Sequence, residues 1–83
     1  MTATAPPRTP EDWLRHLFSA KAAKDGGVVR RSVRDMERWV GRERFLREME
    51  RRGFTVVENA SQVIVFCNAE PVRVVTRVGA NFR

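Results

Sequence analysis

The chain has 83 residues, a length that allows one domain at most. Sixteen lysines and arginines against ten acidic residues give a net charge of +6. The chain is 42% hydrophobic and 31% charged, a composition typical of a folded protein rather than a disordered one. A (β/α)8 barrel, which needs roughly 200 residues or more, and a doubly wound nucleotide-binding fold are both excluded.

The first ten residues contain three of the four prolines and no apolar run. They predict a flexible lead-in over residues 1–8 and no secretory signal. No stretch approaches the ~18 apolar residues of a membrane span, and a single cysteine cannot form an internal disulfide. We therefore expect a cytoplasmic protein with no membrane partner.

The first helix is predicted to begin after Thr9, a residue suited to capping, with Pro10 at the first helical position. Apolar residues at helical spacing then share one face of it: Trp13, Leu14, Leu17 and Phe18. The stretch Lys24–Gly27 is expected to end this helix, because its two glycines readily adopt positive φ.

A brief strand is predicted at Val28–Arg31, followed by a helix that Ser32 caps. Gly41 interrupts the helical pattern, and a third helix is expected over Arg42–Arg52, with Gly53 at the position of a C-terminal cap glycine. One straight helix over residues 33–52 would direct two sets of apolar residues to nearly opposite sides. Two helices broken at Gly41 are therefore preferred. The first set is Val33, Met36 and Val40. The second set is Phe45, Leu46 and Met49, and all three of its residues are expected to point inward.

After Gly53 the pattern changes to that of strands. Phe54–Glu58 and Gln62–Cys67, separated by Asn59–Ser61, predict a hairpin. A further strand is expected at Val72–Val78, and residues 79–83 are expected to form a C-terminal tail. The single domain would then span residues 9–78.

The predicted element order is α-β-α-α-β-β-β, with three helices and a small antiparallel sheet. This α+β arrangement is winged-helix-like, with the first strand paired to the hairpin and the third helix offered to DNA. The alternative architecture is a sheet of three or four antiparallel strands covered by two or three helices.

Positive charge is concentrated in residues 30–52, where nine arginines and five acidic residues give +4. Arg44, Arg47 and Arg51 recur at i, i+3 and i+7 on one side of the third helix, where they can meet phosphates or guanine edges. Arg30 and Arg31, together with Arg73 and Arg77 of the last strand, are expected to assist. The competing interpretation is a solvated face held by i, i+4 ion pairs. The possible pairs are Glu43–Arg47, Arg44–Glu48 and Glu48–Arg52.

Groups capable of catalysis are few. His16 lies beside the apolar face of the first helix, and Cys67 lies in an apolar strand, where a cysteine behaves as a small hydrophobe. One histidine and one cysteine fall short of a zinc site. We therefore predict no catalytic residues, no metal site and no cofactor.

Five groups of residues carry a resemblance: Gly27–Arg31, Val40–Arg42 with Arg44–Leu46, Arg51–Phe54, Glu58–Asn59 with Gln62–Val63, and Val65–Asn68 ending in Pro71. They are similar to stretches in a group of small bacterial proteins of about this length that has no established mechanism. Some of its members carry the automatic label phosphoribosylanthranilate isomerase, which we interpret as the name of a neighbouring gene. Enzymes of that name are full barrels that use a cysteine and an aspartate, and this chain has neither that length nor that paired site. The resemblance therefore transfers no functional residue.

Two functions remain. The first is a small basic nucleic-acid-binding or regulatory module. It would contact the phosphates of duplex DNA or RNA through the arginine stripe of the third helix, formed by Arg44, Arg47 and Arg51. The second is a protein-interaction module or homodimer that uses an exposed sheet edge or helix surface and has no affinity for nucleic acid. An enzyme ranks well below both.

Overall fold

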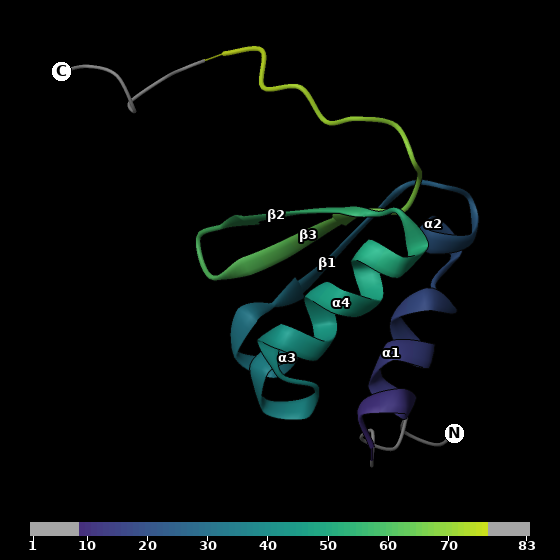
Figure 1. Ribbon diagram of the computed structural model, residues 1–83, viewed down its shortest axis with the longest axis vertical. Coiled ribbons are helices and arrows are strands. Elements are labelled where there is room, and N and C mark those ends of the chain that lie inside the picture. Colours follow the sequence, from purple (N-terminus) through teal and green to yellow (C-terminus); the bar gives the residue numbers. More distant parts are fainter. Residues whose placement is uncertain (1–8, 77–83) are drawn as a thin grey trace, which may run out of the picture.

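The structure is a computed structural model that describes residues 9–76, which form four helices and three strands (Figure 1). The chain is an α+β protein, as predicted. In chain order the elements are α1 (Pro10–Phe18), α2 (Lys21–Lys24), β1 (Val28–Ser32), α3 (Val33–Trp39), α4 (Arg42–Arg52), β2 (Thr55–Asn59) and β3 (Gln62–Phe66).

The first predicted helix is divided in two, so the described residues contain four helices rather than three. The Thr9 hydroxyl caps α1 as expected, because its oxygen accepts a hydrogen bond from the Asp12 backbone N–H at 3.0 Å. Ala20 is extended (φ −62°, ψ 144°) and ends the helical path before α2 begins. The break leaves the Phe18 ring 6.1 Å from that of Phe54 while the chain turns toward β1.

The three predicted boundaries of α3 and α4 are confirmed. The Ser32 hydroxyl accepts a hydrogen bond from the Asp35 backbone N–H at 2.9 Å and caps α3. Gly41 separates α3 from α4 with φ of 96°, and Gly53 ends α4 in the left-handed conformation with φ of 75°. Glycine suits both positions because a side chain there would strain the backbone.

The sheet is antiparallel with strand order β1-β3-β2, so β1 pairs with the hairpin as predicted. The hairpin turn has two residues, Ala60 and Ser61, with φ of 50° and 68°. Positive φ at both central residues matches the twist of the flanking strands. The turn is one residue shorter than expected, and β2 consequently extends to Asn59.

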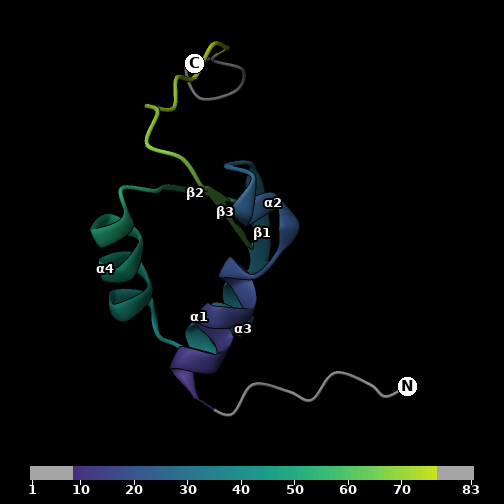
Figure 2. The same cartoon turned by 90° about the vertical axis from the view of Figure 1, so that its right-hand side faces the viewer.

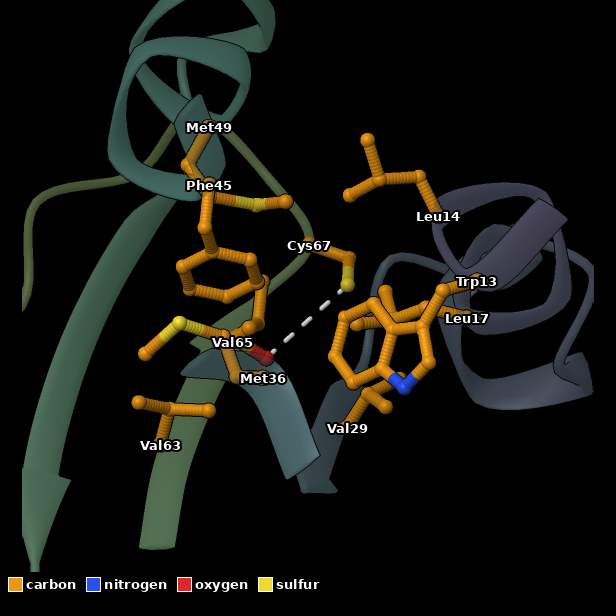
Figure 3. Close-up of a cluster of buried hydrophobic side chains, with 10 residues drawn as sticks. All are labelled: Trp13, Leu14, Leu17, Val29, Met36, Phe45, Met49, Val63, Val65 and Cys67. Carbon is orange, nitrogen blue, oxygen red and sulfur yellow. Dashed lines mark hydrogen bonds between the residues drawn. The ribbon is translucent and has the colours of Figure 1, made fainter. Parts of the chain in front are cut away.

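The helices cover one face of the sheet and leave the other open (Figures 1 and 2). Between helices and sheet lies a core in which Phe45 of α4 and Trp13 of α1 meet edge to face, with ring centroids 6.1 Å apart (Figure 3). Leu46 was expected to point inward, but it is 36% exposed, because it lies about 100° around the helix from Phe45. The buried residues are Trp13, Leu14, Leu17, Val29, Met36, Phe45, Met49, Val63, Val65 and Cys67.

The predicted strand at Val72–Val78 does not form within the described residues, where residues 71–76 have no regular secondary structure and are exposed. The reason is topological. Because β3 is the central strand, both of its edges are already paired, so the chain that follows it cannot form a hairpin with β3, and the free edges of the sheet lie one strand away, on β1 and β2. Residues 77 and 78 lie outside the described range.

Replacing Phe45 with Ala is expected to lower the free energy of unfolding by about 3–5 kcal/mol, because the removed ring leaves a cavity in the core. The matched control is Leu46→Ala on the next residue of the same helix, which should cost about 1 kcal/mol or less at this half-open position. Urea unfolding followed by circular dichroism measures both. Equal losses for the two variants would contradict the assigned orientation of α4.

Candidate nucleic-acid interface

The three arginines of the stripe lie on the side of α4 away from the core. Phe45 and Met49 direct one side of the helix into the protein, which turns Arg47 and Arg51 to solvent and leaves Arg44 half-buried. The helical spacing therefore places these side chains on the outer surface of α4, because only the apolar side of an amphipathic helix has a core to join.

Arg44 is joined to α1 by an ion pair. Its Nη2 donates to Glu11 Oε2 at 2.7 Å, and the two residues are 33 positions apart in the sequence. This hydrogen bond is the main reason that the pKa of Glu11 lies below its ordinary value. Arg44 therefore helps to hold α4 against α1, although both side chains keep access to water.

Glu48 engages the last turn of α4. Its Oε2 accepts from Arg51 Nη2 at 2.5 Å and from Arg52 Nε at 2.9 Å. The hydrogen bond from Arg51, followed by that from Arg52, lowers the pKa of Glu48. The Arg52 guanidinium also lies 3.7 Å from the centre of the Phe18 ring on α1, a cation–π arrangement.

Arg47 differs from its two neighbours in the stripe. It is exposed and forms no ion pair with any residue of the described range 9–76. Of the three i, i+4 pairs that the spacing allows, only Glu48–Arg52 forms among the described residues, and Arg44 turns to Glu11 instead. Arg47 is thus the arginine of this face most available to an external anion.

Arg42 links three elements at the start of α4. Its Nε donates to Glu37 of α3 at 3.1 Å, and its Nη1 donates to Glu58 of β2 at 3.0 Å. The hydrogen bond to Glu58 is the largest cause of the raised pKa of Arg42. Glu58 therefore has a cationic partner within the protein, and this exposed ion pair joins the hairpin to the start of α4.

The remaining predicted residues lie on other surfaces. Arg30 is exposed on the open sheet face, and Arg31 beside it donates from Nη1 to the Arg30 carbonyl at 2.7 Å. Arg73 is exposed in the extended segment after β3, and Arg77 lies outside the described residues. The described residues of the predicted set therefore lie in three places: the stripe on α4, the pair Arg30 and Arg31 on β1, and Arg73 in the segment after β3.

Two exposed arginines of α3 were missed by the sequence reasoning. Arg34 and Arg38 are four positions apart, directly after the Ser32 cap, and so share one side of the helix. The Arg38 guanidinium lies 5.4 Å from the Trp39 ring. Their i, i+4 spacing is the same signal that identified the α4 stripe and would have found them.

A shallow groove of about 400 Å³ runs between α1 and α4. Leu14 and Phe18 contribute apolar surface to it, and charged side chains of both helices border it: Glu11, Arg15, Arg44, Glu48 and Arg52. Several of these charged side chains belong to the ion pairs just described, so the groove mainly follows the line along which α1 and α4 lie against each other.

Cys67 and His16, the two residues considered for catalysis, lie in different environments. Cys67 is buried, with its Sγ 3.8 Å from the Val65 carbonyl oxygen, and burial raises its pKa and favours the neutral thiol. His16 is exposed on α1. Among residues 9–76 no three histidine, cysteine, aspartate or glutamate side chains come together in a way that could hold a metal ion.

No family model, no curated protein and no solved structure matches the chain. A membrane-spanning helix, sufficiently long and apolar, is also not found over the described part of the chain.

Replacing Glu48 with Gln is expected to weaken the acid-dependent loss of stability. The pKa of Glu48 is lowered in the folded state, so its pairs stabilise the fold above the ordinary glutamate pKa, and this contribution is lost as the pH falls through the lowered value. The measurement is the free energy of unfolding from neutral to acidic pH for both proteins. Their difference should shrink as the pH falls, and a difference that stays constant would show that Glu48 does not titrate with folding.

Proposed function

We propose that this chain is a small winged-helix-type module that binds nucleic acid through the outer face of α4. The element order and the strand order β1-β3-β2 support the assignment, because a winged-helix domain pairs its first strand with the hairpin. In that arrangement α4, immediately before the hairpin, is the helix that enters the major groove. The observation that carries the proposal is the exposed, unpaired Arg47 flanked by Arg44 and Arg51.

The ion pairs of the flanking arginines reduce the affinity of this face without blocking it. The Arg44 side chain is 41% exposed and that of Arg51 is 67% exposed, so water and salt screen both pairs and make them weak. A phosphate can replace each carboxylate, and every phosphate neutralised releases condensed counterions from the nucleic acid. Arg47 supplies the first contact, and Arg44 and Arg51 follow by exchanging partners.

The other elements have smaller parts in this proposal. The hairpin turn is short, and its Glu58 is neutralised by Arg42, so we assign phosphate contacts to α4 rather than to the hairpin. Arg30 and Arg31 would meet flanking backbone if the nucleic acid extends past the end of β1. These contacts position the duplex and carry no sequence information by themselves.

Replacing Arg47 with Ala is expected to weaken binding to random duplex DNA and to lower the slope of log affinity against log salt by about one. Lys24→Ala is the matched control, since it removes an equal charge from exposed α2. Fluorescence anisotropy across a salt series measures both. Equal effects of the two variants would show that only net charge matters, and absence of binding by the unaltered protein at low salt would remove the proposal.

Glu11→Gln is expected to tighten binding severalfold, because it frees Arg44 from its carboxylate partner. Glu70→Gln removes the same charge at an exposed position where no ion pair forms with a described residue, and it should change the affinity much less. The same anisotropy titration compares them. If both variants bind equally, Arg44 does not contact the nucleic acid.

A second function is favoured by the open face of the sheet. Alternation along the strands directs apolar side chains of all three strands to this uncovered face: Val28, Val57, Ile64 and Phe66. Val28 and Val57 are exposed there. Such a surface suits a protein-interaction module or homodimer, and the absence of nucleic-acid binding at low salt would favour that function.

A further inference from the structure

The segment after β3 has the composition of a strand but no strand partner. Residues 72–76 are Val-Arg-Val-Val-Thr, mostly β-branched, and Pro71 precedes them. Val74 and Val75 are each 78% exposed, and within residues 9–76 the segment makes no backbone hydrogen bond. Figures 1 and 2 both show it leaving the sheet away from α1, α3 and α4.

The sheet offers two unpaired edges, the outer edges of β1 and β2. An edge strand presents free N–H and C=O groups that an additional strand can join. Each edge has five residues, the same length as residues 72–76.

We propose that residues 72–76 of one chain pair antiparallel with the β2 edge of a second copy, and that the two copies exchange these segments reciprocally. In full overlap the register places Arg73 opposite Glu58, Val74 opposite Val57, and Thr76 opposite Thr55. Glu58 already pairs with Arg42, and because both of these side chains are nearly half exposed, Arg73 would join this ion pair as a second cation. Opposite charges, β-branched pairs and threonine pairs are favourable cross-strand neighbours. The remaining two positions pair Val75 with Val56 and Val72 with Asn59.

The β1 edge is a worse partner because of its charge. Full antiparallel overlap with β1 would set Arg73 directly opposite Arg31 and Val74 opposite Arg30. Like charges directly opposite each other destabilise a sheet. Parallel overlap with β2 is also unfavourable, because it would set Glu58 opposite Val75 and leave Arg73 opposite Val56.

Reciprocal exchange gives both copies the same new contacts, as a two-fold symmetric dimer requires. Each segment would obtain the strand pairing that the central position of β3 denies it within its own chain. This dimer uses the edge of the sheet rather than the outer face of α4, so it stands independently of nucleic-acid binding.

The first experiment measures the mass of the full chain by light scattering after gel filtration, over a concentration series. The unaltered protein should approach twice its chain mass of 9.6 kDa. Val74→Pro should reduce it to the single-chain mass, because proline removes a backbone N–H and disfavours strand pairing. Val74→Thr, which keeps the N–H and the β-branch, is the matched control and should still dimerise.

The helical circular-dichroism signal of Val74→Pro should match that of the unaltered protein, since residue 74 lies outside every helix of the fold, and only the contribution of the added strand should be lost. A single-chain mass for the unaltered protein throughout the series would overturn the proposal. So would a dimer that persists in Val74→Pro.

A second experiment identifies the edge. Under mild oxidation the double variant Val57→Cys with Val74→Cys should form a covalent species of twice the chain mass on a non-reducing gel, and the native Cys67 is buried and should not compete. The control double variant, Arg30→Cys with Val74→Cys, tests the β1 edge and should remain mostly single-chain. Equal or greater cross-linking of the control would overturn the assignment to β2.

Discussion

The contact between Phe45 of α4 and Trp13 of α1 determines how the rest of the molecule is arranged. Only ten described residues are buried, so few other side chains can orient the helices. Once Phe45 is directed inward, Met49 follows on the same side of α4 and the arginines are turned outward. The surface charge of this helix is therefore a consequence of how its core side is packed, since a small domain buries too little surface to orient a helix in several ways.

Ion pairs then decide how that surface is used. The outward side of α4 carries both signs, and Glu11 and Glu48 engage two of the three stripe arginines. The Glu11 pair connects α1 to α4 and the Glu48 pair lies within α4, and both lower the free positive charge of the face without removing it. Arg47 keeps its charge exposed. A basic protein of this kind is best described by the arginines that remain available, because total net charge overstates what an anionic partner can reach.

The sheet poses a different constraint. Among the described residues the last strand is β3, whose two edges are both paired, so the valine-rich segment that follows cannot form a hairpin with it. The charges of the two outer edges differ, with Arg30 and Arg31 on β1 and Glu58 on β2. This asymmetry distinguishes the two edges for any additional strand, as cross-strand charge pairs commonly do.

The sequence by itself determined the features that depend on neighbouring residues. Thr9 and Ser32 as helix caps, the break at Gly41, the glycine end of α4 at Gly53 and the hairpin all follow from local backbone preferences. The outward direction of Arg44, Arg47 and Arg51 follows from helical spacing alone, which made the candidate face predictable as a pattern.

Only the tertiary structure decided the features that join distant residues. The Arg44–Glu11 pair connects positions 33 apart, and no local pattern predicts which carboxylate an arginine meets at that separation. The break between α1 and α2 at Ala20 accompanies the contact of Phe18 with the distant Phe54, and the unpaired state of residues 72–76 depends on the strand order. Local preference can make a segment suited to a strand, but pairing requires a free edge, and the position of that edge is a property of the whole fold.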